Sequence, residues 1–141
     1  MDAAFNYKEV DSLSAELAQH CPNGIDVDFE NVGGAHLDAA LEHMKPRGRI
    51  VLCGMISQYN VGTPSGPSNL RLAVRKRLTL QGFIVSDHVD RQAQFYADMA
   101  AWIAAGKMHW QETIVDGLEN APRAFIGLFS GDNAGKMLVR L

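Results

Sequence analysis

Two short apolar runs, separated by a segment with helical spacing, form the clearest pattern in this chain. Residues 25–29 and 49–53 are rich in β-type side chains. Between them, residues 35–44 place apolar side chains three and four positions apart, namely Leu37, Ala40, Leu41 and Met44. Pro46 and Gly48 then stop the helix. The pattern predicts a strand–helix–strand unit, which is the connection that parallel strands need.

The rest of the chain continues this alternation of helices and strands. Asp11 or Ser12 can cap a helix that stops near Cys21, residues 69–77 predict a short helix, and residues 78–85 predict a strand. Residues 87–105 give the strongest helical pattern, with Gly106 at its C′ position. A strand at 113–115, a helix from Asn120 with Pro122 in its first turn, and a strand at 136–141 complete the series.

Each of the two organising runs ends in a polar turn that contains glycine. These turns are residues 30–34 and 54–60. Ligands of open parallel sheets bind at the carboxyl ends of the strands, so we expect Asn31, Cys53 and Tyr59 on the rim of one crevice. Each has a plainer interpretation: Asn31 as a helix cap or Asx-turn, Cys53 as a small buried side chain, and Tyr59 as a packing residue with a hydrated hydroxyl.

Composition narrows the class of protein. With 141 residues, 47% apolar and 21% charged, the chain is long enough for one ordinary domain core. A net charge of −3 argues against nucleic acid as a partner. Two cysteines without CxxC spacing, no apolar run of membrane-spanning length and no signal-peptide pattern favour a cytoplasmic protein without a membrane span. No His, Cys or carboxylate cluster has the spacing of a metal site, so no metal is expected.

Several segments, taken as a set, resemble one enzyme family. They are Phe-Glu-Asn-Val-Gly-Gly (29–34), Gly-Arg-Ile-Val-Leu-Cys-Gly (48–54), Ile-Ser-Gln-Tyr-Asn (56–60), Gly-Phe-Ile-Val (82–85), Gly-Leu-Glu-Asn-Ala-Pro (117–122) and Gly-Asp-Asn-Ala-Gly-Lys (131–136). They are similar to the cofactor domain of zinc-independent medium-chain dehydrogenases/reductases. The most similar branch is the prostaglandin, alkenal and curcumin reductases.

The resemblance implies a fold and a domain division. It implies an α/β chain with a partial, Rossmann-like doubly wound parallel sheet, the C-terminal half of a dinucleotide-binding domain. Residues 1–107 would form the partial NADP-binding domain, and residues 108–141 a strand–helix–strand segment bordering a catalytic domain. Without that domain, the strands of the second segment would pair with each other, pair with a neighbouring chain, or stay loose.

The resemblance also implies an activity. The family uses NADPH to reduce the carbon–carbon double bond of enones, so the implied cofactor is NADP and the implied partner is a small-molecule enone. Family members also carry an N-terminal catalytic domain and a Gly-rich phosphate-binding turn, and no GxGxxG occurs in these residues. We therefore expect the chain alone to have little activity. The alternative is a non-catalytic nucleotide-binding or dimerisation module.

The matching positions name the site residues. By resemblance, Tyr59 is the catalytic candidate, Asn31 contacts the nicotinamide half of the cofactor, and Tyr7 lies near the adenosine 2′-phosphate. Gly33 would let the backbone approach the ligand, although turn geometry explains it equally well. The resemblance places four further positions beside the cofactor: Cys53, Phe83, Ile84, Val85, with a secondary role for Asn133. From the residues alone, 83–85 are core positions and Asn133 is turn chemistry.

Two further expectations concern surfaces. A strand at 78–85 would lie at the outer edge of the half-sheet, and the resemblance places a homodimer interface there. The basic residues of 71–77, with Arg47 and Arg49, are best explained as a solvated helix face, and attraction of cofactor phosphate is a minor alternative.

Overall fold

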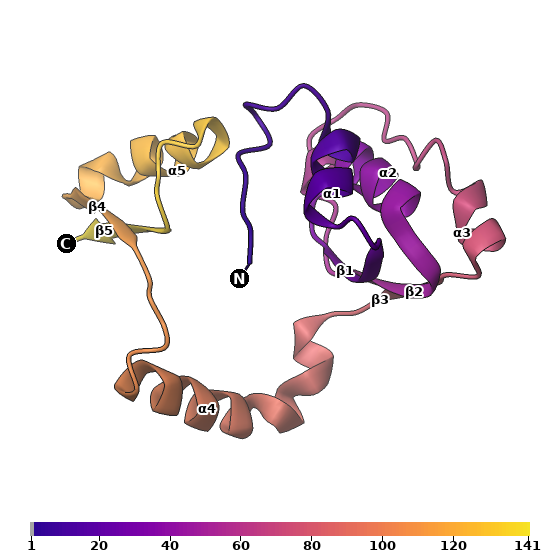
Figure 1. Ribbon diagram of the computed structural model, residues 1–141. Helices are drawn as coiled ribbons and strands as arrows, with labels where there is room; N and C mark the ends of the chain where they lie inside the picture. Colours follow the sequence, from indigo (N-terminus) through magenta and orange to yellow (C-terminus); the bar gives the residue numbers. More distant parts are fainter. Residues whose placement is uncertain (1) are drawn as a thin grey trace. The chain divides into compact units, whose positions relative to one another are not determined.

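The computed structural model describes residues 2–141 and divides the chain into two compact units. Unit 1 ends at His88, and unit 2 runs from Val89 to Leu141. Figure 1 traces both units along the chain. No helix within residues 2–141 has the length and apolar character needed to cross a membrane. The domain division expected after residue 107 stays a prediction.

Unit 1 is a three-stranded parallel sheet with helices on one face. In chain order its elements are α1 (Leu13–His20), β1 (Ile25–Glu30), α2 (Gly34–His43), β2 (Met44–Leu52), a short 3₁₀ turn (Ile56–Gln58), α3 (Arg71–Lys76) and β3 (Thr79–Gly82). The strand order is β1-β2-β3, and both pairs are parallel. The predicted strand–helix–strand unit and the α/β class are thereby confirmed, and Figure 1 shows α1 and α2 on the same side of the sheet.

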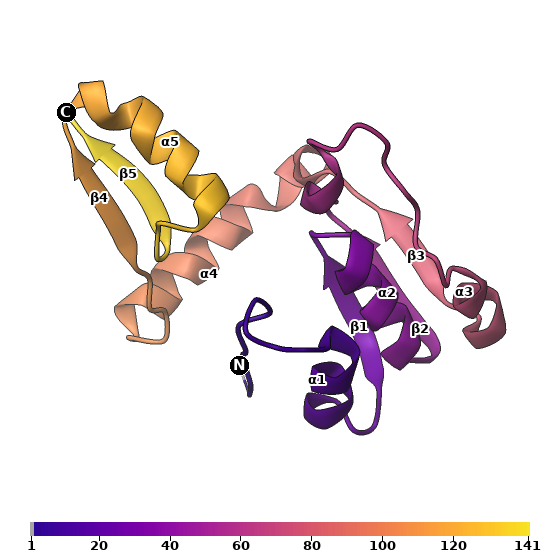
Figure 2. The same cartoon turned by 90° about the horizontal axis from the view of Figure 1, so that it is seen from above.

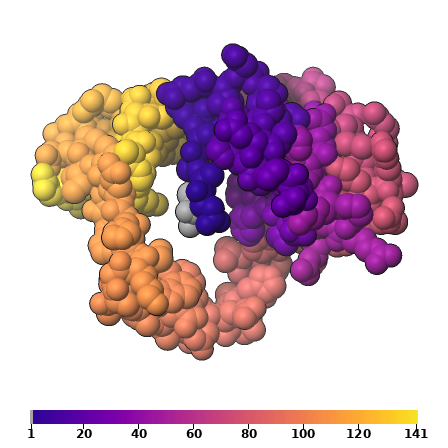
Figure 3. Space-filling model, in the orientation of Figure 1, coloured from indigo at the N-terminus to yellow at the C-terminus, as the bar shows by residue number. Residues whose placement is uncertain are grey.

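Helices α1 and α2 have different N-terminal caps. The hydroxyl of Ser12 accepts a hydrogen bond from the Ala15 N–H, so Ser12 is the cap of α1. Helix α2 starts after Gly33, whose φ of 73° only glycine adopts without strain and which supplies no side-chain cap. The segment before α1 lies at the surface of unit 1 (Figure 3), where the Phe5 ring stacks on His20.

Strand β2 starts earlier than the sequence suggested. Met44 already pairs with Ile25, and the regular register resumes at Val27 and Arg49. The residues between form an irregularity in which Arg47 has a φ of 66°. Pro46 and Gly48 therefore end α2 as expected but lie within a bulged strand, not before it, because a bulge absorbs the extra residues without ending the pairing.

The core of unit 1 lies between the sheet and its helices. Leu37, Leu41, Met44 and Ile50 form a fully buried cluster. The opposite sheet face is open: Val27 and Phe29 remain 54% and 59% exposed, whereas Glu30 at the end of β1 is buried. A parallel sheet is normally apolar because both faces are covered, and in unit 1 the helices cover one.

Asp28 points to the covered face, since its partner in the register is the buried Ile50. Its Oδ2 atom is buried and has no hydrogen-bond partner among the described residues. Burial, followed by the nearby Glu30 carboxylate, raises the pKa of Asp28 from 3.8 to about 6. Unit 1 thus holds a carboxyl group that keeps its proton up to a higher pH than a carboxyl group in water.

Helix α3 fastens the end of α2. The Lys76 ammonium donates hydrogen bonds to the carbonyl oxygens of Leu41 and Glu42, at 2.9 and 2.6 Å. These carbonyls are in the last turn of α2, where they lack helical partners and where a cation is favourable. Burial and the Arg75 charge lower the pKa of Lys76, while Glu42 acts in the opposite direction. Lys76, which was predicted to be part of a solvated basic face, therefore makes structural hydrogen bonds instead.

The predicted 78–85 strand and 87–105 helix are each only partly correct. Strand β3 stops at Gly82, and a 3₁₀ segment (Val85–Arg91) precedes α4 (Gln92–Ala104). The backbone leaves helical values at His88, with φ −120° and ψ 31°, so one helix does not span the segment. The predicted end is confirmed, because Gly106 follows the C-cap Ala105 with a φ of 65°.

Unit 2 also contains a parallel strand pair. Strands β4 (Glu112–Asp116) and β5 (Lys136–Arg140) pair with each other, joined through α5 (Ala121–Ser130), which lies along them in Figure 2. Of the three expected alternatives, mutual pairing is the one observed. Asn120 precedes α5 but does not cap it; its amide donates to the Asp116 carbonyl instead, at 2.8 Å. Gly131 ends α5 in the left-handed conformation.

The first prediction concerns the α2–α3 contact. Lys76→Met should destabilise unit 1 by about 1 kcal/mol, because two carbonyls at the end of α2 lose their donor. Amide hydrogen exchange in α2 measures this, since Trp102 and Trp110 both belong to unit 2 and their fluorescence does not report on unit 1. Arg75→Met is the matched control, because it removes the same charge one position earlier. Equal effects of the two substitutions would contradict the prediction.

The second prediction concerns pH. Because the pKa of Asp28 is raised in the folded state to about 6, the folded state binds this proton more tightly than the unfolded state. The resulting stabilisation is complete below about pH 4 and is lost as the pH rises through 6. Asp28→Asn should therefore make unit 1 more stable than the unchanged protein above pH 6.

This expectation is tested by unfolding both proteins in urea and monitoring the stability of unit 1 through hydrogen exchange of the β1 and β2 amides. The stability difference between Asp28→Asn and the unchanged protein should grow between pH 4 and pH 6 and stay constant above. A difference that does not depend on pH would show that the Asp28 carboxyl is not perturbed.

Candidate functional site

The turns that follow β1 and β2 are joined by backbone hydrogen bonds. The Glu30 carbonyl accepts from the N–H groups of Cys53 and Gly54, at 2.9 and 3.1 Å. The Asn31 carbonyl accepts from Ile56, and the Val32 carbonyl accepts from the backbone and hydroxyl of Ser57. The expectation that the two turns meet at one edge of the sheet is confirmed by these contacts.

Glu30 is a residue that the sequence analysis did not single out. It is 4% exposed, and its Oε1 atom accepts from the backbone N–H groups of Val32 and Gly33, at 2.6 and 2.9 Å. A carboxylate that accepts two or three positions ahead satisfies donors that precede a helix. The signal in the sequence was a charged residue at the end of an apolar run, directly before an Asn-x-Gly-Gly turn.

Asn31 lies on the exposed rim of this edge. Its side-chain amide makes a single long contact, 3.5 Å to the Phe29 carbonyl. It does not cap α2, because Gly33 occupies that position and Glu30 holds the N–H groups before it. Gly33 itself is buried, and a Cβ there would lie 3.2 Å from the Met55 side chain. Close packing of the two turns, together with its positive φ, therefore accounts for Gly33.

Tyr59 lies on the same rim, 65% exposed. Its hydroxyl oxygen accepts a hydrogen bond from the Met55 N–H at 3.1 Å. Gly54 allows this arrangement, since a Cβ at that position would lie 3.1 Å from the Tyr59 hydroxyl and 3.3 Å from the Asn31 carbonyl. The phenolic proton stays free to donate elsewhere.

The interpretation of Cys53 as a small buried side chain is wrong. The structure leaves it exposed at the end of β2, not buried, because its N–H bonds to the Glu30 carbonyl while its side chain faces outward. It lies between the strand and the Tyr59 loop. The expected position on the rim is therefore observed.

Tyr7 lies beside the first turn of α2. Its ring meets His36 edge-on at 4.9 Å, and the side chain is 53% exposed. His36, like Glu30, was not singled out from the sequence. The contact places Tyr7 in unit 1, at the end of α2 that follows the Asn31 turn.

The three residues after β3 behave differently from one another. Phe83 is half-buried, with its ring 5.8 Å from Phe29 and its N–H bonded to the Leu52 carbonyl. Ile84 and Val85 are exposed, so their assignment to the core is wrong. The strand has ended at Gly82, and the 3₁₀ segment turns these two side chains outward.

Asn133 belongs to unit 2. Its amide donates to the Gly135 carbonyl at 2.6 Å and closes the turn before β5. This is the turn chemistry expected from the residues alone. Its cofactor role stays a prediction.

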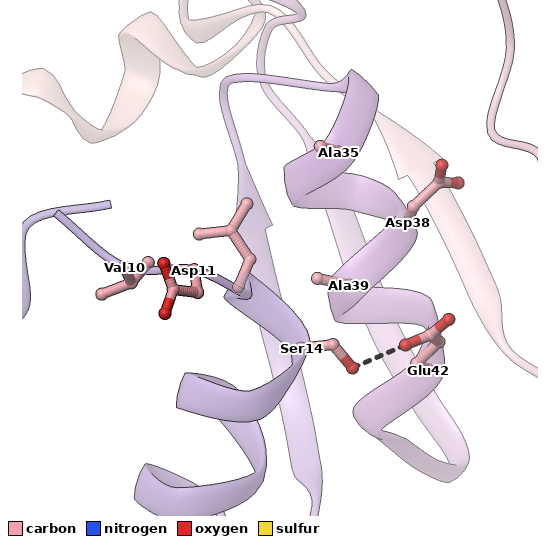
Figure 4. A pocket seen from close by; sticks show the side chains of 8 residues that line it. Val10, Asp11, Ser14, Ala35, Asp38, Ala39 and Glu42 are labelled. Carbon is pink, nitrogen blue, oxygen red and sulfur yellow. Dashed lines mark hydrogen bonds between the residues drawn. The ribbon is translucent and has the colours of Figure 1, made fainter. Parts of the chain in front are cut away.

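A second candidate binding site is a groove on the outer side of α2 (Figure 4). It lies between α2 and the start of α1, and its polar side chains include Asp11, Asp38 and Glu42. Two of these carboxylates already have partners: Asp38 accepts from the backbone and hydroxyl of Ser68, and Glu42 accepts from the Ser14 hydroxyl. The groove is therefore a place where α1 and α2 pack against each other, and two of its carboxylates hold neighbouring segments of unit 1. Residues 2–141 contain no group of three side chains placed to hold a metal ion.

Comparison with known proteins agrees with this geometry. The family described as zinc-binding dehydrogenase matches residues 1–105. The chain is 49% identical to the NADP(+)-dependent 2-alkenal reductase of Nicotiana tabacum over 98% of its length. It is 44% identical to the NADPH-dependent curcumin reductase of Escherichia coli over 93%, and 41% identical to prostaglandin reductase 1 of Bos taurus over 99%. It covers 40%, 40% and 43% of those proteins.

Solved structures show the same relationship. CurA from Vibrio vulnificus, in complex with NADPH, superposes with a TM-score of 0.82 at 46% identity, over 94% of this chain and 41% of that one. The quinone oxidoreductase of Escherichia coli, at 21% identity and a TM-score of 0.77, shares the fold. The parallel sheet is thus the C-terminal half of a Rossmann-like domain. The chain belongs to the zinc-binding dehydrogenase family of medium-chain dehydrogenases/reductases, in the branch of the alkenal, curcumin and prostaglandin reductases.

Proposed function

We propose that this chain carries the nicotinamide-side rim of an NADP(H) site in an oxidoreductase that reduces the carbon–carbon double bond of α,β-unsaturated ketones or aldehydes. The observation that carries the proposal is the pair of exposed polar side chains, Asn31 and Tyr59, on turns fastened together at the carboxyl ends of β1 and β2. Relatives that match over nearly the whole chain are named as NADP-dependent reductases of this kind.

The residues present suit such a cofactor. The Asn31 amide is nearly free of internal contacts and can bond to a carboxamide or ribose group. The backbone of 83–85 lies directly after the third strand of the same sheet. Tyr7 is proposed to lie near the adenosine phosphate, and Gly33, Cys53 and Asn133 to lie around the cofactor. When bound, NADPH supplies the hydride that is transferred to the β-carbon of the enone.

Tyr59 is the proposed catalytic residue. As hydride reaches the β-carbon, negative charge develops on the carbonyl oxygen of the substrate, and a hydrogen-bond donor at that oxygen lowers the barrier. The Tyr59 hydroxyl accepts from the Met55 N–H, which fixes its position and leaves its proton to donate. Accepting one hydrogen bond also strengthens a hydroxyl as a donor.

The alternative function is a non-catalytic nucleotide-binding or dimerisation module built on the same sheet. As a dimerisation module it would use the carboxyl edge of the sheet for packing alone. The two proposals differ in one measurable respect, because the reductase requires NADPH to contact the Asn31 and Tyr59 turns. The free cysteines Cys21 and Cys53 are consistent with the proposed cytoplasmic location.

The third prediction is that the 141-residue chain binds NADPH weakly and does not turn over an enone. The sequence holds no Gly-rich turn for the pyrophosphate. Without several charge-assisted hydrogen bonds of about 1.5–3 kcal/mol each, affinity should fall to about 1 mM or weaker. Titrating NADPH and following the amide resonances of Asn31 and Tyr59 measures binding. Absorbance of the reduced nicotinamide with 3-nonen-2-one measures turnover.

Tyr59→Phe is the informative variant in this experiment, because it removes the hydroxyl and keeps the ring. Tyr96→Phe is the control, since Tyr96 is an exposed tyrosine of α4 bonded to Gln92. Turnover that disappears in Tyr59→Phe alone would show that the chain by itself is a catalyst. Absence of any NADPH-induced shift at either turn would favour the dimerisation module.

The fourth prediction is a homodimer joined along β3. This strand is an edge of the sheet in unit 1, and an edge presents unpaired backbone groups. We expect light scattering to show a dimer that dissociates on dilution. Thr79→Lys should favour the monomer, because Thr79 is an exposed residue of β3 and charges discourage edge pairing. A protein that is monomeric at every concentration would contradict the proposal.

A further inference from the structure

Glu30 uses both its backbone and its side chain to build the carboxyl edge of the sheet. Its carbonyl accepts two N–H groups from the turn after β2, and its carboxylate accepts two from the turn after β1. It is one of the two buried polar residues of the described chain, at 4% exposed. Four donors therefore converge on a single residue that is shielded from water.

The carboxylate binds the N–H groups of the two residues that lead into α2. The N-cap position of α2 is Gly33, which has no side chain to offer. Without Glu30, the N–H groups of Val32 and Gly33 would have no acceptor, and Gly33 is buried. A negative charge at this place also interacts favourably with the N-terminus of α2.

A short series of contacts leads from Glu30 to Tyr59. The Glu30 carbonyl accepts from the N–H of Gly54, where a Cβ would lie 3.1 Å from the Tyr59 hydroxyl and 3.3 Å from the Asn31 carbonyl. The next residue, Met55, donates its N–H to the Tyr59 hydroxyl. Asn31 directly follows Glu30 in the chain. The carboxylate reaches the Tyr59 loop by a second route: it binds the Val32 N–H, and the Val32 carbonyl accepts from the backbone and hydroxyl of Ser57.

We infer that Glu30 is the positioning residue of this site, through which Asn31 and Tyr59 are held at a fixed distance from one another. The inference rests on the proposed function for its meaning in catalysis, but not for its geometry. Glu30 does not touch substrate or cofactor, because its carboxylate is turned toward the backbone.

The geometry ranks the substitutions. Glu30→Gln keeps a carbonyl oxygen in the same place but loses the charge, so both N–H bonds should weaken. Glu30→Asp keeps the charge but is one methylene shorter, so it cannot reach both donors from the same backbone position. Glu30→Ala removes the acceptor altogether. The backbone bonds to Cys53 and Gly54 are available in all three variants.

The test is amide hydrogen exchange and NADPH titration on the 141-residue protein by NMR. In Glu30→Gln, the Val32 and Gly33 amides should exchange about tenfold faster, and in Glu30→Ala about a hundredfold faster. The NADPH-induced shifts at Asn31 and Tyr59 should shrink in the same order. Amides of the α2 core, such as that of Leu41, should be unaffected in Glu30→Gln, which separates local positioning from global stability.

Asp38→Asn is the matched control. Asp38 is also a carboxylate of unit 1 that accepts a backbone N–H from a loop, at Ser68, so the same chemical change is made away from the site. It should leave the Asn31 and Tyr59 turns unchanged. Unchanged exchange at Val32 and Gly33 in both Glu30→Gln and Glu30→Ala would overturn the inference, whatever NADPH does.

The two proposals fail in distinguishable ways. If NADPH shifts no amide of the unchanged protein, the proposed function fails while the exchange measurement still decides the role of Glu30. If NADPH shifts Asn31 and Tyr59 equally in the unchanged protein and in Glu30→Ala, the inference fails and the proposed function stands.

Discussion

The carboxyl edge of the sheet depends on one buried carboxylate. Where parallel strands end, their last backbone groups and those of the following turns must find partners or remain hydrated. In unit 1 Glu30 supplies a carbonyl to one turn and a carboxylate to the other, so both turns are satisfied at one place. A buried charge is costly unless hydrogen bonds compensate it, and here two backbone donors do so. The arrangement of the candidate site follows from this compensation.

The same strand carries a carboxyl group that is not compensated. Asp28 lies two residues before Glu30, on the covered face, and one of its oxygens has no partner among the described residues. Burial and the Glu30 charge raise its pKa to about 6, so the neutral form is favoured only below that pH. Two acidic residues on one strand therefore differ: backbone donors compensate the charge of Glu30, whereas one oxygen of Asp28 has no partner among the described residues.

Much of the fold could be predicted from the sequence because its signals were local. Apolar spacing located α2, the capping residues Asp11 and Ser12 located the start of α1, and Gly106 located the end of α4. The errors arose where distant contacts decide. Pairing of Met44 with Ile25 extends β2 through Pro46, and the 3₁₀ segment after β3 exposes Ile84 and Val85. An apolar side chain alone does not show whether its residue belongs to the strand or follows the end of the strand.

The Asn31 side chain does not have the capping role that its residue type suggests. From the residues alone, an asparagine before two glycines is best explained as a cap or a turn residue. In the structure Gly33 occupies the cap position and Glu30 binds the N–H groups before the helix, so the Asn31 amide is left with one long contact. Tyr59 likewise is no packing residue, since it is largely exposed and held by its hydroxyl. Both side chains thus lie exposed on the same edge of the sheet, and the proposed recognition of a ligand rests on this observation.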